Sequence, residues 1–258
     1  MDHHINPLAV HIQTIKRRLV VIGAAILVSL ILTFSFSGQM VAWLNRPFQN
    51  QLVFYGPTEA LFASIKVSLL AAVILSLPII FYQCWKFVEP ALLPKEQRWA
   101  IPLFFLAAGL FALGLVFCNL VILPLVIDFF VSFGLDRDVT PQLSVGTYID
   151  FNVKFLLIFG CAFELPLVMT LLAVTGAVSA QMFARYRKHA ILSNLILAAI
   201  ITPDATLFTM LLMAVPLMAL YEIGILGARF FGRSSAGGGI DLPVDPDLPI
   251  GTAGTRLR

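Results

Sequence analysis

Long apolar runs, separated by short polar connections, dominate this sequence. Because an α-helix rises about 1.5 Å per residue, roughly 20 apolar residues cross a hydrocarbon core of about 30 Å. The pattern predicts six membrane helices, at about residues 19–36, 61–82, 101–126, 149–174, 190–201 and 207–231. The fifth is unusually short, because the turn signal Thr202-Pro203-Asp204 separates it from the sixth. The predicted fold class is therefore an all-α membrane protein with six transmembrane helices.

The composition agrees with this prediction. Hydrophobic residues make up 59% of the 258-residue chain and charged residues 12%, whereas soluble domains carry about 25% charged residues. So little polar surface cannot cover a protein in water, which excludes the soluble and disordered classes for most of the chain. Residues 232–258 are the exception, because they are rich in Ser, Gly, Pro and Asp and lack apolar periodicity. We expect them to be a disordered cytoplasmic tail.

Positive charges indicate the orientation. The N-terminal segment, the second-to-third and fourth-to-fifth connections and the tail together carry thirteen Lys and Arg residues, whereas the other two charged connections carry two. Loops rich in Lys and Arg stay on the cytoplasmic side. The sequence thus predicts a multi-pass protein of the cell inner membrane with cytoplasmic N- and C-termini. Residues 1–18 form the cytoplasmic N-terminal segment and residues 19–231 the six-helix domain.

Ionisable residues inside the apolar runs need an explanation, because charge is costly in hydrocarbon. Glu164 lies near the centre of the fourth run. It is interpreted either as a functional buried acid or as a protonated side chain that is hydrogen-bonded within the bundle. Lys66 and Lys154 fall near external helix ends, and we expect both to extend toward the headgroups. Asp150 is expected to be solvated.

The second-to-third connection, residues 85–98, combines aromatic, acidic and basic side chains. Glu89 and Glu96 lie on the side that the orientation rule makes basic. A carboxylate can hold an arginine through two parallel hydrogen bonds, so Glu96 near Phe87 is a candidate for binding a basic, partly apolar peptide. In the alternative interpretation, Glu96 pairs with a neighbouring basic residue on a solvated surface.

The sequence contains none of the patterns typical of enzymes or cofactor proteins. It lacks a nucleophile elbow, a zinc-protease helix, a P-loop and a dinucleotide-binding fingerprint. Its three cysteines have no metal-ligand spacing, and no basic stripe with interleaved aromatics suggests nucleic acid. We therefore expect no enzymatic activity, no cofactor, no metal and no nucleic-acid partner.

Three stretches resemble the TatC family. Residues 11–19, HIQTIKRRL, are similar to the family pattern H-L-x-E-L-R-x-R-L. Residues 87–98, FVEPALLPKEQR, are similar to F-x-x-P-A-L-x-x-x-E-x-R, and residues 163–166, FELP, to F-E-x-P in the fourth helix. The resemblance covers about residues 6–231 in the same order.

This resemblance implies a receptor for twin-arginine signal peptides. Such a receptor works with TatA- and TatB-type single-span proteins, is expected to form homo-oligomers, and exports folded proteins with the proton-motive force. Its six helices form a concave, glove-like shape. By position, Glu96 and Phe87 match the signal-binding loop, Glu164 matches the fourth-helix acid on the concave side, and Asp204 approximately matches an acid between the last two helices.

The N-terminal motif departs from the family pattern at two positions. Thr14 replaces a glutamate and Lys16 replaces an arginine. The acidic patch for the two signal arginines therefore loses one carboxylate, and Glu89 is the residue that could compensate.

Two alternative functions stay open on the sequence alone. An ion-coupled transporter of a small solute would use Glu164 as its coupling group, although the chain lacks the internal repeat that such transporters often have. A paralogue that assembles with Tat partners but has weakened signal recognition would explain Thr14.

Overall fold

The computed structural model describes residues 7–44, 53, 55–89, 100–135, 144–201 and 207–232, and these are almost entirely helical. In chain order the helices are α1 (Pro7–Phe34), α2 (Ser37–Leu44), α3 (Pro57–Val88), α4 (Ala100–Phe117), α5 (Leu123–Leu135), α6 (Val145–Phe163), α7 (Leu165–Val174), α8 (Ala180–Arg185), α9 (Arg187–Ile201) and α10 (Leu207–Phe231). A π-helical turn, Cys118–Ile122, joins α4 to α5. No strand occurs in these ranges, so the predicted all-α class is confirmed.

Five helical stretches among the described residues are long and apolar enough to cross a membrane: Ile15–Phe34, Pro57–Phe87, Ile101–Ser132, Val145–Val174 and Leu207–Phe231. The chain is thus a multi-pass membrane protein. The short fifth segment is confirmed as a helix, because α9 has 15 residues. At about 22 Å it is shorter than the hydrocarbon core, so the sixth crossing remains a prediction.

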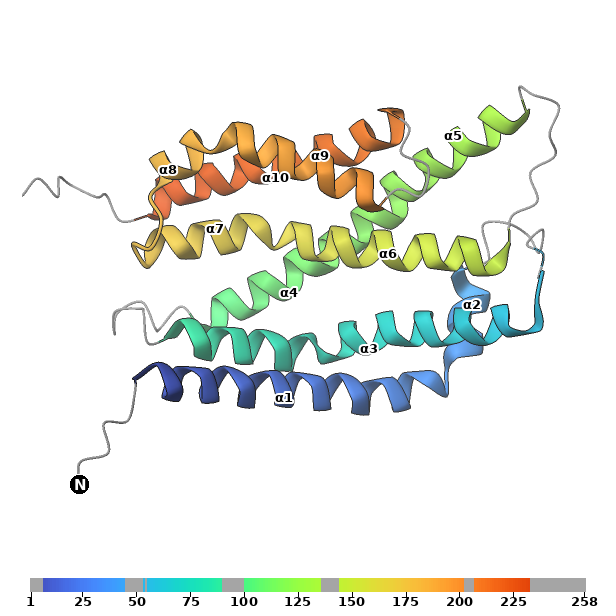
Figure 1. The fold of residues 1–258 in the computed structure, drawn as a ribbon, viewed down its shortest axis with the longest axis horizontal. Helices are drawn as coiled ribbons and strands as arrows, with labels where there is room; N and C mark the ends of the chain where they lie inside the picture. The colour runs from blue at the N-terminus through green and yellow to red at the C-terminus, as the bar shows by residue number, and fades with distance from the viewer. Residues whose placement is uncertain are drawn as a thin grey trace, which may run out of the picture.

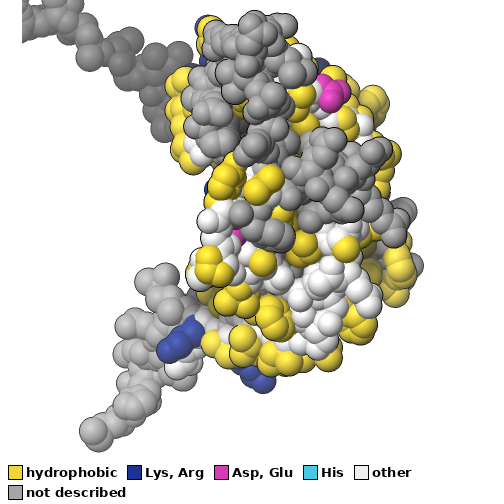
Figure 2. Space-filling view, turned by 90° about the vertical axis from the view of Figure 1, so that its right-hand side faces the viewer, with side chains coloured by type: hydrophobic (Ala, Val, Ile, Leu, Met, Phe, Trp, Pro, Cys, Tyr) yellow, Lys and Arg dark blue, Asp and Glu magenta, His cyan; other side chains and the backbone are white. Residues whose placement is uncertain are grey.

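The helices pack against one another in a layer that α4 and α5 cross obliquely (Figure 1). Helix α1 lies against α3, α3 against α6, α4 against α6, and α7 against α10 (Figure 1). We call the end at which α3 and α6 begin, drawn at the right in Figure 1, the outer end, after its predicted location, and the opposite end the inner end. Seen from the outer end, the molecule is hollowed on one side (Figure 2). A concave shape agrees with the expectation from the sequence.

Small and hydroxyl side chains bring the helices together. Between α1 and α3, the Ser76 hydroxyl donates to Ser29 Oγ over 2.9 Å and Thr33 Oγ1 donates to the Ser68 carbonyl over 2.9 Å. Such bonds hold helices together in lipid, where the hydrophobic effect supplies no attraction between them.

Two helix boundaries differ from the sequence prediction at the inner end. Helix α3 continues six residues beyond Tyr82, so Phe87 lies on a helix and not in a connection. The prediction ended where the apolar run ended, but Gln83 and Lys86 are good helix formers and Pro90 is the next residue that cannot continue the helix. At the N-terminus, α1 begins at Pro7, inside the predicted cytoplasmic segment.

The third and fourth crossings are each interrupted. The fourth divides at Glu164 into α6 and α7, because Pro166 lies in the first turn of α7 and lacks the N–H that would continue the backbone ladder. In the third, the π-helical turn directly precedes Pro124, and such turns are common insertions in α-helices.

At the outer end, Glu59 of α3 connects two segments far apart in sequence. Its Oε1 accepts the Gly146 N–H over 2.7 Å and the Ser144 hydroxyl, while Oε2 accepts the Tyr55 N–H over 2.8 Å. Ser144 also caps α6 by accepting the Thr147 N–H. The carboxylate thereby fixes the start of α3 against the start of α6.

Candidate functional site

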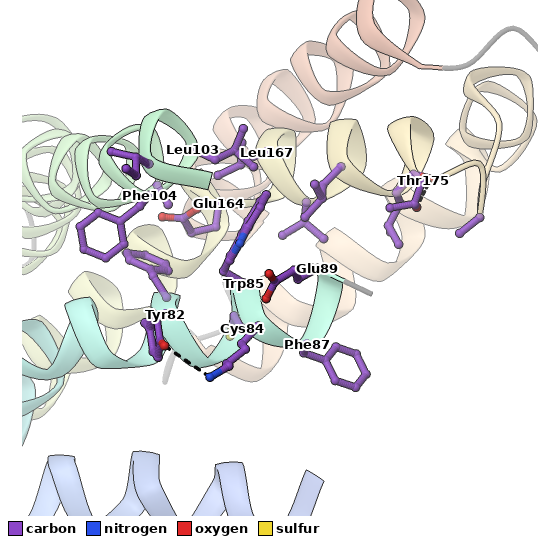
Figure 3. A pocket seen from close by; sticks show the side chains of 18 residues that line it. Tyr82, Cys84, Trp85, Phe87, Glu89, Leu103, Phe104, Glu164, Leu167 and Thr175 are labelled. Atoms are coloured by element: carbon purple, nitrogen blue, oxygen red, sulfur yellow. Dashed lines mark hydrogen bonds between the residues drawn. The ribbon is translucent and has the colours of Figure 1, made fainter. Parts of the chain in front are cut away.

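A cavity of about 990 Å³ opens in the inner half of the molecule, between α3, α4 and α7. Aromatic rings supply much of its wall: Phe81, Tyr82, Trp85, Phe87 and Phe104. The lining also includes the carboxylates of Glu89 and Glu164 and the ammonium of Lys86. Figure 3 shows Trp85 between the two carboxylates, with Leu103 and Leu167 beside Glu164. The cavity therefore has a mainly apolar surface with two acids, Glu164 at the break between α6 and α7 and Glu89 at the end of α3.

Glu164 reaches this cavity from the break between α6 and α7. The break leaves it outside both helices, and its side chain is partly buried. Its Oε1 atom is buried and has no hydrogen-bond partner among the described residues. Buried polar atoms normally have a partner, and an unpartnered one is costly. Both interpretations of Glu164 remain predictions, and Oε1 is available to a donor from outside the described residues.

Glu89 ends α3, and its backbone N–H donates to the Trp85 carbonyl. Its side chain is partly buried and lines the cavity together with Trp85. The carboxylate that the sequence suggested as a substitute for a missing acid therefore lies within the candidate site.

Phe87 lies at the edge of the same cavity and is 52% exposed. The Arg18 guanidinium of α1 lies over its ring, with Cζ 5.8 Å from the centroid, and Arg18 also donates to the Gln83 carbonyl over 3.4 Å. A cation over an aromatic face is attracted by the ring quadrupole. The contact brings the N-terminal motif and the α3 end together.

For the remaining predicted residues, the structure describes little or nothing of the side chains. Lys16 is exposed on α1. Thr14 lies on α1, but its side chain falls outside the described part of the structure, as do Glu96 and Asp204 in full. The roles of these four residues remain predictions.

The site also contains three residues for which no role was predicted from the sequence: Trp85, Phe104 and Arg18. Arg18 lies in the N-terminal motif and Trp85 lies two residues before Phe87. Their closeness in sequence to residues with a predicted role could have indicated that they belong to the site. Phe104 had no such signal, because its position depends on the angle at which α4 meets α3.

The chemistry of the cavity is that of binding. In the ranges that the structure covers, no group of three or more His, Cys, Asp or Glu residues could hold a metal ion. Apolar and aromatic walls with a few polar groups are typical of ligand sites. Here the charged groups are two acids and one lysine, so acids are in excess, which favours a ligand with apolar side chains and a positive group.

Comparison with known proteins identifies the family. The family model described as Sec-independent protein translocase protein (TatC) matches residues 10–216. The chain belongs to the TatC family. A TatC protein of Aquifex aeolicus is 38% identical over 233 residues, which cover 88% of this chain and 96% of the relative. A TatC protein of Desulforapulum autotrophicum is 38% identical over 234 residues, covering 88% and 86%.

The fold agrees with this membership. A crystal structure of the twin arginine translocase receptor TatC matches with a TM-score of 0.79 and 36% sequence identity, over 86% of this chain and 99% of that chain. TatC membership makes the chain a protein translocase component and supports the translocase interpretation over the solute-transporter alternative.

Proposed function

We propose that this chain is the subunit of a twin-arginine translocase that binds twin-arginine signal peptides. The observation that carries the proposal is the cavity of the inner half, whose aromatic walls and two carboxylates suit a peptide with both apolar and basic residues. Family membership and the likeness to a TatC receptor structure support it.

In this proposal the arginine pair is held at the inner end by carboxylates. Glu96 takes one guanidinium through two parallel hydrogen bonds, a geometry that favours arginine over lysine. Glu89 takes the other and so compensates for Thr14. Phe87 offers an aromatic face, and its contact with Arg18 supports the idea that a guanidinium fits there. Lys16 flanks this acidic patch on α1.

The apolar part of the signal then enters the cavity beside Trp85 and Phe104. The orphaned Oε1 of Glu164 accepts a hydrogen bond from the incoming chain or a partner helix, which would remove the cost of leaving it unpaired. Asp204, between α9 and α10, is proposed to act on the same translocation path.

The proposed setting is the cell inner membrane, with six crossings and both termini in the cytoplasm. The proposed partners are TatA- and TatB-type single-span proteins, further copies of this chain, and twin-arginine signals on folded cargo. The proton-motive force drives transport, and the chain itself has no catalytic role.

Crosslinking tests the arginine site. A photo-reactive twin-arginine signal should crosslink to residues 85–98 of the full chain in membrane vesicles, and Glu96→Ala should lower the yield severalfold, because one guanidinium loses its partner. The matched control is Gln97→Ala, which changes the neighbouring residue without removing charge. Equal yields from Glu96→Ala and the parent chain would contradict the proposed role.

Restoring the family residue separates a full receptor from a paralogue with weakened recognition. Thr14→Glu should increase the preference for an arginine pair over a lysine pair in the same crosslinking assay if the acidic patch is one carboxylate short. If Glu89 already compensates, Glu89→Gln in the parent chain should abolish the preference and Thr14→Glu should rescue it. A chain that shows no preference in any of these forms would support the paralogue.

A further inference from the structure

Two lysines and one aspartate form a cluster in the outer half of the molecule, away from the candidate site. Lys66 Nζ of α3 lies 2.7 Å from Asp150 Oδ1, and Lys154 Nζ of α6 lies 2.8 Å from Asp150 Oδ2. From the sequence, both lysines were expected to extend toward the headgroups and Asp150 to be solvated. The structure adds a feature that the sequence did not predict, because all three side chains converge from two adjacent helices.

The cluster carries one positive charge in excess. Both lysine salt bridges in the described part of the chain end on the same carboxylate, so one ammonium is left without a counter-charge of its own. Glu59, the next acid along α3, already accepts three hydrogen bonds at the outer end. An excess cation inside an apolar segment is costly unless an anion or water reaches it.

Helix packing explains one lysine but not the other. Lys66 and Asp150 connect α3 to α6 and complete a structural ion pair. Lys154 is four residues after Asp150 on the same helix, connects no further element, and is 58% exposed at its side chain. Its ammonium therefore remains accessible from the surface.

The depth of the cluster points to the hydrocarbon boundary. Lys66 and Lys154 each lie nine residues, or about 13 Å, after the first residue of their helix. Their spans have 31 and 30 residues, or roughly 45 Å against a core of about 30 Å. Centred in the bilayer, each span therefore places its lysine Cα about 6 Å inside the core, from which a lysine stem reaches the headgroup layer.

We propose that Lys66 and Lys154 bind the phosphate of an anionic phospholipid at the membrane face where α3 and α6 begin. Lipid phosphates are the most concentrated anions at this depth, and a phosphodiester accepts hydrogen bonds from two ammonium groups while supplying the missing negative charge. The site is independent of the proposed signal-binding function, and on the predicted topology it takes a lipid of the outer leaflet.

Native mass spectrometry of the full chain in detergent tests the site, with phosphatidylglycerol as the probe. Lys154→Gln removes the exposed ammonium and leaves the Lys66–Asp150 pair intact, so the fold is preserved. It should weaken binding of the tightest phosphatidylglycerol by about fivefold, and Lys154→Arg should retain the binding. Lys86→Gln, at the opposite end of α3, is the matched control and should have a smaller effect.

Three results would overturn the proposal. Unchanged binding to Lys154→Gln would mean that Lys154 does not contact lipid. An equal loss in Lys86→Gln would show a general effect of net charge. Displacement of phosphatidylglycerol by millimolar inorganic phosphate would show that the cluster binds a free anion and not a lipid headgroup.

Discussion

Two carboxylates in the outer half of this molecule and Glu164 in the inner half differ in how their oxygens are used. In the outer half, Glu59 and Asp150 each accept bonds from two helices or loops, and both oxygens of each are used. In the inner half, Glu164 leaves Oε1 buried and unpartnered beside a cavity of about 990 Å³. These two outer carboxylates are therefore satisfied within the chain, whereas Glu164 keeps a buried acceptor available to a partner. A receptor that must hold its shape while its site accepts different ligands needs both properties.

The largest expected effect comes from separating the helices that support both halves. A Cβ at Gly114 of α4 would lie 2.6 Å from the Phe159 carbonyl oxygen and 3.1 Å from the Gly160 Cα of α6. Because backbone atoms cannot move aside as a side chain can, Gly114→Val should destabilise the protein by about 3 kcal/mol. Thermal unfolding in detergent measures this.

Gly109→Val is the matched control for this substitution. It lies on the same helix, and a Cβ there meets no atom within 4 Å. Because the added side chain meets no neighbour there, the melting temperature should change little. An equal fall of the melting temperature in both variants would contradict the role of close packing at Gly114.

A pair of identical substitutions sharpens the contrast between the halves. In Glu59→Gln, the amide nitrogen must face an N–H, because both oxygens of Glu59 accept backbone N–H groups, so the melting temperature should fall by several degrees. In Glu164→Gln, the unpartnered oxygen has no such bond to lose, so stability should be retained. An amide oxygen is a weaker acceptor than a carboxylate oxygen, so export of a twin-arginine reporter should fall.

Measurements of the melting temperature and of reporter export together test the contrast between Glu59 and Glu164. The contrast is wrong if Glu164→Gln lowers the melting temperature as much as Glu59→Gln does. It is also wrong if Glu164→Leu, which removes both oxygens, leaves export unchanged, since the unpartnered oxygen would then serve no ligand.

The smallest expected effect concerns the exposed ring at the inner end. Phe87→Leu keeps an apolar side chain but removes the aromatic face, so binding of a twin-arginine signal should weaken about threefold, as expected for an exposed cation–π contact. Fluorescence titration with a labelled signal measures the affinity. Tyr82→Leu, five residues earlier and with Lys86 instead of Arg18 over its ring, should weaken binding less. The reverse order would remove the role of Phe87.

The helices were predictable because apolar run length is a direct physical requirement of the bilayer. The ends of the helices were harder to predict than the helices themselves. Helix α3 continues past the apolar run to Phe87, because helix propensity and not hydrophobicity decides where it stops. The break at Glu164 had a signal in Pro166, yet a proline can kink a helix without dividing it.

The site was predictable in part, because short motifs in the sequence resemble those of a known family. Phe87, Glu89 and Glu164 were singled out from the sequence and line one cavity. Trp85 and Phe104 were not, because their meeting depends on interhelical angles. The pairing of Lys66 and Lys154 with Asp150 was missed because a snorkelling lysine and a salt-bridged one have the same sequence pattern.

The π-helical turn at Cys118–Ile122 has a consequence for how chain length can vary. Such a turn holds one residue more than an α-turn of 3.6 residues, without changing which sides of the flanking helices face inward. A chain shortened by one residue here would run as an unbroken α-helix, and α4 and α5 would keep their present contacts. The third crossing thus contains a place where a single-residue deletion is accommodated without rotating either half.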